Sequence, residues 1–441
     1  MKVHFLGIAG SGSSAIANIA ASEGFEISGC DKSLTSEFTS DLPQDKLFSG
    51  HSEEHLKDID ILAVTPAIYS LDPNNPELVE AKKKGIKIQT WQEFMGEYLE
   101  KDKTVIAICG THGKSTTTAM VGDMLEKAGA DPIVELGAVV NSWKRNFRTS
   151  SRHPEANAIG SKRGYFITEA DEFNDNFLVT HPNITIVTTI EMDHPEYFKD
   201  FKALKESYLK FFYQTKDLII ANLSDPGVAD VLTTFQKDKE KKYHPQIIDY
   251  SKSEILFPLL IPGKHNLLNA AAVFQLGIAL GIDSVEITKA LESFTGISRR
   301  FEHLGKYQGA EVFTDFGHHP TEIEVTIKAA REKFPNKKLI LIFQPHMFSR
   351  TKALFDDFVR VLKKAPVDQV ILMDIYPSRE VDTGLIKSWQ IAESAKSPKV
   401  IYNGAEEIKE TLHRIADEDT VLFFMGAGDI DNLARKLASL S

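Results

Sequence analysis

The chain of 441 residues has little cysteine and no long apolar run. Its only two cysteines, Cys30 and Cys109, exclude a disulfide framework or a zinc site built from cysteine alone, and they favour a reducing compartment. No apolar stretch approaches the roughly 20 residues needed to span a bilayer. The first residues show no signal-peptide pattern. These absences predict a cytoplasmic protein that does not enter the membrane.

An excess of positive charge is also missing. Acidic residues outnumber basic ones by 62 to 51, which gives a formal net charge of -11. A chain without a broad basic surface is a poor candidate for binding nucleic acid through its phosphates. The length predicts about three domains, each able to bury a core of its own.

Short apolar runs alternate with helical patterns, which is typical of α/β layers with mainly parallel sheets. We predict three such domains, over residues 1–100, 101–296 and 297–441, with a linker at 100–103. The predicted strands are 3–8, 26–30, 59–65, 86–89, 104–109, 165–167, 185–189, 218–221, 312–314, 339–343, 370–373, 400–402 and 421–424.

The most specific motif is a glycine loop between the apolar run 105–109 and a helical pattern. Its residues are Gly110, Thr111, His112, Gly113, Lys114, Ser115 and Thr116. The backbone N–H groups of such a loop wrap around phosphate oxygens, and the next helix adds its positive N-terminal end. Lys114 would reach the β- and γ-phosphates, and the Ser115 hydroxyl would bind Mg²⁺. Ile108 replaces the outer glycine of the full Walker pattern.

Two acidic segments follow predicted strands and could supply more Mg²⁺ ligands. Residues 169–172 read Glu-Ala-Asp-Glu, and residues 191–194 read Glu-Met-Asp-His. Strand ends of this kind bind ligands in open α/β sheets. Carboxylates suit Mg²⁺, whereas an imidazole such as that of His194 is an unusual ligand for it.

A second glycine loop follows the first predicted strand. Gly10, Ser11 and Gly12, with Ala15 in the third glycine position, fit the dinucleotide-binding fingerprint, and Asp31 lies at the end of the next strand. This pattern indicates NAD, but a UDP-sugar diphosphate fits the same backbone, so both ligands stay open. Two phosphate-binding loops predict two phosphorylated ligands.

The last third of the chain places polar side chains at predicted strand ends, which favours an anion-binding site. They are His318, His319, His346 and Arg350. Asn266 and Asn269 are three residues apart on one helix face, where amides either read a purine edge or cap the helix. No G-x-S-x-G motif or Cys/His nucleophile context indicates a hydrolase.

Together these motifs resemble those of the Mur ligases, in order and over essentially the whole chain. The matching segments are 110–116, 169–172, 193–194, 263–266, 299–302 and 315–322. The resemblance implies an α/β protein with a Rossmann-like UDP-sugar domain, a central P-loop ATPase-type domain with a parallel sheet, and a C-terminal Rossmann-like domain.

The match is best to family members that join L-alanine to UDP-N-acetylmuramate in cytoplasmic peptidoglycan precursor synthesis. The resemblance therefore implies an ATP-dependent ligase, a monomer or homodimer, that uses ATP and Mg²⁺. ATP would convert the lactyl carboxylate to an acyl phosphate, and the alanine amine would attack it, leaving ADP and phosphate as products.

The resemblance also implies roles for individual residues. The catalytic set is Lys114, Glu169, His194, His318 and Arg350. The ATP site comprises Gly110, Thr111, His112, Gly113, Lys114, Ser115, Thr116, Asn266, Asn269, Arg300 and Asp315. Mg²⁺ would be held by Ser115, Glu169 and His194. The UDP-sugar would contact Gly10, Ser11, Gly12, Asp31, His51 and Thr65.

This chain departs from the family pattern at several positions. Phe173 and Asn174 replace a Ser-Asp pair, and Met347 replaces an arginine beside the substrate. The acceptor therefore stays open among alanine, glycine, serine and a recycled murein tripeptide. Lys205 lies where some members carbamylate a lysine, and we expect it to be unmodified. The alternatives from other classes are an NAD-dependent oxidoreductase and a non-catalytic nucleotide sensor.

Overall fold

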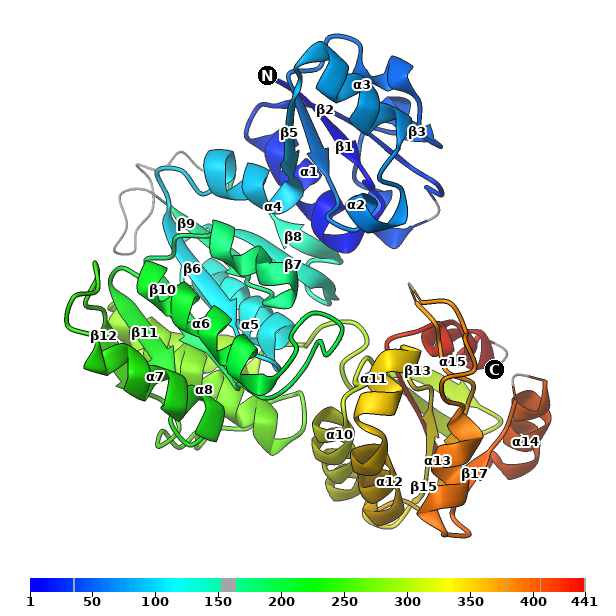
Figure 1. Ribbon diagram of the computed structural model, residues 1–441. Helices are drawn as coiled ribbons and strands as arrows, with labels where there is room; N and C mark the ends of the chain where they lie inside the picture. The colour runs from blue at the N-terminus through cyan, green and yellow to red at the C-terminus, as the bar shows by residue number, and fades with distance from the viewer. Residues whose placement is uncertain (35, 152–163, 379, 405, 440–441) are drawn as a thin grey trace. The chain divides into compact units, whose positions relative to one another are not determined.

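The computed structural model describes residues 1–34, 36–151, 164–378, 380–404 and 406–439. It contains three β-sheets of mainly parallel strands, with helices packed around them (Figure 1). The α/β class and the three parallel-sheet domains that the sequence predicts are confirmed. Within the described residues, no helix has both the length and the apolar character that crossing a membrane demands.

The first sheet has five strands in the order β3-β2-β1-β4-β5, and all of its pairs are parallel. The strands are β1 (Lys2–Leu6), β2 (Glu26–Asp31), β3 (Leu47–Ser49), β4 (Ile61–Val64) and β5 (Lys87–Thr90). The helices are α1 (Ser11–Ser22), α2 (Ile68–Leu71), α3 (Pro76–Lys84) and α4 (Trp91–Phe94), joined by short turns that include η3 (Glu53–Leu56). Asn75 caps α3 by accepting a hydrogen bond from the backbone N–H of Glu77.

The second sheet has seven strands in the order β12-β11-β10-β6-β9-β7-β8, and only β8 runs antiparallel to its neighbour. The strands are β6 (Thr104–Cys109), β7 (Ile133–Val140), β8 (Arg145–Arg148), β9 (Tyr165–Glu169), β10 (Ile184–Val187), β11 (Leu218–Ala221) and β12 (Gln246–Asp249). The helices are α5 (Lys114–Lys127), α6 (Phe201–Gln214), α7 (Pro226–Lys237), α8 (Lys264–Ala279) and α9 (Ser284–Glu292). The central strand β6 ends at the phosphate loop.

The third sheet has six strands in the order β13-β14-β18-β15-β16-β17, with β13 antiparallel to β14. The strands are β13 (Glu302–Tyr307), β14 (Ala310–Asp315), β15 (Lys338–Phe343), β16 (Gln369–Leu372), β17 (Val400–Tyr402) and β18 (Thr420–Met425). The helices are α10 (Pro320–Lys333), α11 (Phe348–Ala353), α12 (Phe355–Lys364), α13 (Ser388–Ala395), α14 (Glu407–Ile415) and α15 (Ile430–Ala438). Pro320 occupies the first turn of α10, where its missing N–H group leaves no helical hydrogen bond unmade.

Five strands of the structure were not predicted from the sequence: β3, β7, β8, β12 and β13. Four of them, all except β7, lie at an edge of their sheet. An edge strand is partly exposed, so it lacks the continuous apolar run that marks a strand buried on both faces. In β7, the apolar run is interrupted by Glu135 and Gly137.

The chain divides into two compact units. The first unit comprises Met1–Glu191, Lys202–Pro258 and Leu268–Thr295; the second comprises Met192–Phe201, Leu259–Leu267 and Gly296–Ser441. The first two sheets therefore belong to one unit, and the domain boundaries at 100/101 and 296/297 stay predictions. The predicted linker at 100–103 does not begin as a solvated segment. Glu100 is buried and accepts a hydrogen bond from Thr180 Oγ1 at 2.9 Å.

Candidate active site

The phosphate loop joins β6 to α5 in the first unit. Gly110 (φ +128°) and Gly113 (φ +84°) adopt left-handed backbone conformations that glycine takes without steric cost. A Cβ atom at Gly110 would lie 2.1 Å from Thr188 Oγ1, and one at Gly113 would lie 2.9 Å from Asn269 Oδ1. Because Gly113 directly precedes α5, the first N–H groups of that helix are available to an anion. The loop has the backbone form that phosphate binding requires.

Contacts with the segment after β10 fix the middle of this loop. The Thr111 N–H donates to Thr189 O at 2.7 Å, and the Thr111 hydroxyl donates to Glu191 O at 3.1 Å. The His112 N–H donates to Thr189 Oγ1 at 3.1 Å, and its ring contacts the Glu191 carboxylate. Thr116 is buried in the first turns of α5. The predicted loop residues therefore lie together on a rigid support.

Lys114 already has a carboxylate partner. Its ammonium donates to Gly110 O at 2.7 Å and to Glu172 Oε2 at 3.0 Å. Burial would lower the pKa of Lys114, but the charge of Glu172, followed by those of Asp171 and Glu169, raises it above its usual value. Lys114 is therefore charged throughout the physiological range. The sequence analysis missed this pair, although Glu172 stands in the acidic segment that it singled out.

Ser115 and Glu169 form an oxygen cluster beside Lys114. The Ser115 hydroxyl donates to Glu169 Oε1 at 2.8 Å, and Glu169 Oε2 accepts from the Gly137 N–H at 2.8 Å. A hydroxyl and a carboxylate at the mouth of a phosphate loop are hard oxygen ligands of the kind that Mg²⁺ prefers. The residues present therefore fit Mg²⁺.

The N-terminal glycine loop connects β1 to α1. Gly7, directly after β1, is the residue in the left-handed region, at φ +86°, whereas Gly10 has φ -70° and caps α1. The Asp31 carboxylate accepts a hydrogen bond from the Ala9 N–H at 3.1 Å. The structure thus places Asp31 against this loop, and its role toward a ligand stays a prediction. Sequence analysis overlooked Gly7, although its position right after a strand is a signal for a tight turn.

His51 and Thr65 also lie at this end of the first sheet. Thr65 directly follows β4, and a Cβ atom at Gly7 would lie 2.6 Å from its Cγ2 atom. His51 Nδ1 lies 3.2 Å from the Cys30 sulfur. The sequence offered no signal for the contact between His51 and Cys30.

A cavity of about 160 Å³ in the first unit is lined by residues of the N-terminal glycine loop and of the segment at the end of β9. Ser11 and Gly12 line it from the N-terminal loop, and Glu169 and Asp171 line it from the end of β9. Its remaining lining residues are Trp91, Gln92, Met95, Glu135, Gly137, Thr168, Ala170, Asn176, Phe177 and Thr180. Residues predicted to bind a sugar diphosphate and a metal therefore face one space.

In the second unit, Arg350 and Asp193 form a buried ion pair. Arg350 Nη2 lies 2.9 Å from Asp193 Oδ1, and Arg350 Nη1 lies 3.4 Å from His346 Nδ1. Burial lowers the pKa of the nearby His318 to about 3, so its ring is neutral. Three of the four predicted residues, Arg350, His346 and His318, thus lie close together beside the Asp193 carboxylate, and anion binding there stays a prediction.

Arg300 and Asp315 are held by neighbouring backbone and by Glu322. The Asp315 carboxylate accepts from the Gly317 N–H at 2.7 Å and from the Phe301 N–H at 2.9 Å. Burial raises its pKa. Arg300 Nη1 lies 3.2 Å from Glu322 Oε1, and the same carboxylate closes the capping box of α10. These contacts fix the loop that carries Arg300.

Three further predicted residues are placed separately. His194 has a left-handed backbone (φ +54°), and its Nδ1 lies 3.4 Å from Glu196 Oε1 in the second unit. The Asn266 amide donates to Pro262 O at 2.7 Å, whereas Asn269 lies beside Gly113 in the first unit. The roles of His194, Asn266 and Asn269 toward metal and adenine stay predictions.

Family models cover most of the chain. The Mur ligase family catalytic domain matches residues 2–103, the Mur ligase middle domain matches 108–277, and the Mur ligase glutamate ligase domain matches 299–428. The UDP-N-acetylmuramate–L-alanine ligase of Caldicellulosiruptor saccharolyticus is 35% identical over 98% of this chain and 96% of its own length. The enzyme of the same name from Clostridium botulinum (strain Langeland) is 34% identical over 99% and 97%.

Solved structures agree with these sequence relatives. The UDP-N-acetylmuramate–alanine ligase of Thermotoga maritima superposes with a TM-score of 0.78 at 27% identity, covering 100% of this chain and 99% of its own. A murein peptide ligase from Psychrobacter arcticus shares the fold, with a TM-score of 0.70 at 21% identity over 100% and 98% of the two chains. The resemblance noted in the sequence is confirmed, and the chain belongs to the Mur ligase family of ATP-dependent ligases.

Proposed function

We propose that this protein joins L-alanine to the lactyl carboxylate of UDP-N-acetylmuramate, with conversion of ATP to ADP and phosphate. The reaction would supply a peptidoglycan precursor in the cytoplasm. The names of the relatives that match the whole chain support this choice of substrates. The observation that carries it is the cavity lined by Ser11 and Gly12 together with Glu169 and Asp171. A sugar diphosphate held at the N-terminal loop could present its carboxylate there.

The reaction needs activation because a carboxylate is a poor electrophile. Its oxygen attacks the γ-phosphorus of ATP, which gives an acyl phosphate and ADP. The amine then attacks the acyl carbon, and phosphate leaves from the tetrahedral intermediate. In this scheme Lys114 exchanges Glu172 for the β- and γ-phosphates. Ser115 and Glu169 would hold one Mg²⁺, and Glu169 and His194 would hold a second; when bound, these ions would neutralise phosphate charge.

The family resemblance also assigns roles to residues of the second unit. Asn266 would contact adenine, and Arg300 and Asp315 would act on the nucleotide. His318 and Arg350 would orient the sugar carboxylate and the incoming amino acid. Because burial keeps His318 neutral, it offers a hydrogen bond without adding charge. Met347, which replaces the arginine usual in the family, is buried and brings no charge to this neighbourhood.

Phosphate release tests the proposal directly. The full-length protein is incubated with Mg-ATP and UDP-N-acetylmuramate, and L-alanine, glycine, L-serine or the L-Ala-γ-D-Glu-diaminopimelate tripeptide is added in turn. We expect release to depend on L-alanine and on UDP-N-acetylmuramate. If only the tripeptide stimulates release, the acceptor is a peptide and not alanine. Binding of ATP without release for any acceptor would indicate a nucleotide sensor, and tight NADH binding would support an oxidoreductase.

A further inference from the structure

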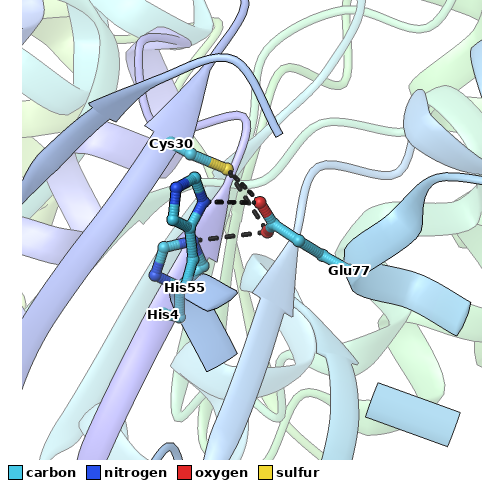
Figure 2. Close-up of side chains that lie close together, drawn as sticks. All are labelled: His4, Cys30, His55 and Glu77. Carbon is cyan, nitrogen blue, oxygen red and sulfur yellow. Dashed lines mark hydrogen bonds and ion pairs between the residues drawn. The ribbon is translucent and has the colours of Figure 1, made fainter. Parts of the chain in front are cut away.

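Four side chains with metal-binding atoms converge inside the first sheet domain, away from the phosphate loop. They are His4 of β1, Cys30 of β2, His55 of η3 and Glu77 of α3 (Figure 2). Their ligand atoms all lie within 4.8 Å of one another. His4, Cys30 and Glu77 are buried, and His55 is largely covered. The proposed ligase reaction uses none of the four.

Glu77 is the centre of this cluster. Its Oε1 lies 3.0 Å from Cys30 Sγ and 2.9 Å from His55 Nδ1, and its Oε2 lies 3.3 Å from His4 Nε2. Glu77 therefore places both of its carboxylate oxygens against donor groups inside the domain, where a buried carboxylate needs such partners.

His4 has one ring nitrogen held and one aimed at Glu77. His4 Nδ1 is hydrogen-bonded to Ser28 Oγ at 2.8 Å. In the described part of the chain, His4 Nε2 has no hydrogen-bond partner, because its contact with Glu77 meets only the distance of an ion pair. In metal sites a hydrogen bond at one ring nitrogen orients the imidazole, and the other nitrogen binds the metal. A cation between His4 and Glu77 would satisfy both.

We propose that His4, Cys30, His55 and Glu77 bind one Zn²⁺. Sulfur, nitrogen and oxygen donors together favour zinc over Mg²⁺, which prefers oxygen alone. Four protein ligands would close the site, as in structural rather than catalytic zinc centres. A Cys30 thiolate and the Glu77 carboxylate would cancel the two positive charges of the ion. The buried centre would then be neutral overall.

The distances are close to those that zinc would set. Zinc–ligand bonds of roughly 2.0–2.3 Å in a tetrahedron separate the ligand atoms by about 3.3–3.7 Å. The three contacts of Glu77 are 2.9, 3.0 and 3.3 Å long. Shifts of less than about 1 Å would therefore open these contacts to tetrahedral spacing.

Neighbouring groups already orient the four ligands. The Ser52 N–H donates to Glu77 Oε1 at 3.1 Å, and the Phe48 ring stacks on His55 with centroids 4.4 Å apart. His51 Nδ1 lies 3.2 Å from the Cys30 sulfur. Outer groups of this kind fix ligand orientation in metal sites. The ion would also hold the loop that carries His51.

Cobalt binding tests the site, because tetrahedral Co²⁺ bound to a thiolate absorbs by sulfur-to-cobalt charge transfer. The full-length protein is stripped with a chelator under reducing conditions and titrated with Co²⁺. We expect about one equivalent of Co²⁺ to give this band. Excess Mg²⁺ should leave the band unchanged, and one equivalent of Zn²⁺ should abolish it. Absence of the band in folded protein would overturn the proposal.

Variants separate this centre from other metal-binding groups. Cys30→Ser should lose the charge-transfer band, whereas Cys109→Ser should keep it. Because both thiols are buried, Cys109→Ser is the matched control. Glu169→Gln removes a proposed Mg²⁺ ligand and should also keep the band. His55→Gln, at the least buried ligand, should weaken Co²⁺ binding at least 10-fold and covers the case that Cys30→Ser does not fold. An unchanged band in folded Cys30→Ser, or unchanged affinity in His55→Gln, would refute the assignment.

Discussion

Arg350 and Asp193 are 157 residues apart in the sequence, yet their side chains form a hydrogen-bonded ion pair of 2.9 Å inside the second unit. Burial would raise the pKa of Asp193, but the charge of Arg350, followed by that of His194, holds it well below its usual value. Both side chains are almost fully covered. The pair thus ties the segment after β10 to the C-terminal sheet domain.

Replacing Arg350 with methionine should destabilise the fold. The change would leave a buried carboxylate without its cation, which costs about 3–5 kcal/mol. The urea concentration at the unfolding midpoint should fall clearly, and Arg350→Lys should recover part of this fall. Arg360 pairs with Asp357 while half exposed, so Arg360→Met is the matched control, with a loss of less than about 1 kcal/mol. Equal losses for both arginines would show that the buried pair with Asp193 stabilises the fold no more than an exposed pair does.

Lys114→Ala should remove phosphate release while leaving the protein folded. We expect activity to fall at least about 100-fold, because a positioned cation on transferring phosphate contributes on that order. Binding of UDP-N-acetylmuramate, measured by calorimetry, should stay within about twofold. Lys127, at the other end of α5, pairs with Asp123, and Lys127→Ala should keep most of the activity. Normal turnover in Lys114→Ala would remove the phosphate loop from the mechanism.

Glu135 should make stability fall as the pH rises. Burial, followed by the charge of Glu169, raises its pKa from 4.5 to about 8. Between these pH values the unfolded chain loses the proton and the folded chain keeps it, so unfolding becomes easier as the pH increases, with no change outside this window.

Glu135→Gln removes the contribution of Glu135 to this pH dependence. At pH 8 the variant should be more stable than the parent by about 2–4 kcal/mol, and near pH 4 the two should be equal. Denaturant midpoints across the pH range measure the effect. Glu254 is exposed, so Glu254→Gln should follow the parent at every pH. A constant difference between Glu135→Gln and the parent would mean that Glu135 is ionised in the folded protein.

Gly12→Ala should strain the wall of the cavity. A Cβ atom at Gly12 would lie 2.5 Å from Trp91 Cζ2, whereas one at Gly10 would lie 3.6 Å from Gly7 O, an ordinary van der Waals contact. Crowding of a ring in a packed site costs about 1–3 kcal/mol. The melting temperature should therefore fall for Gly12→Ala and stay nearly unchanged for Gly10→Ala. Tryptophan fluorescence should shift only in Gly12→Ala. Equal melting of the two variants would show that Trp91 moves freely.

Strands buried on both faces could be predicted closely from the sequence. The predicted strands 104–109 and 218–221 have the bounds of β6 and β11. Such strands carry continuous apolar runs that local composition reveals. Strand β13, by contrast, is mostly half-exposed and contains Gly305, so its pattern does not differ from that of a loop.

The phosphate loop could also be predicted from the sequence, because its glycine spacing is a local pattern. The carboxylate that pairs with Lys114 could not be predicted. Glu172 meets Lys114 only because β9 lies beside β6, a pairing that no short-range pattern encodes. The neighbours of Cys30 were hidden likewise, since Glu77 lies 47 positions away on a helix. Roles implied by family resemblance still need the experiments above.

The Lys114–Glu172 pair has a consequence for which anions can occupy the loop. A free phosphate or sulfate ion must compete with a carboxylate that is already 3.0 Å from the ammonium and is fixed in the protein. A polyphosphate that also engages the backbone N–H groups of the loop offers enough contacts to replace it. In the proposed reaction, the Glu172 carboxylate would therefore disfavour binding of small anions at the loop and favour nucleoside triphosphates.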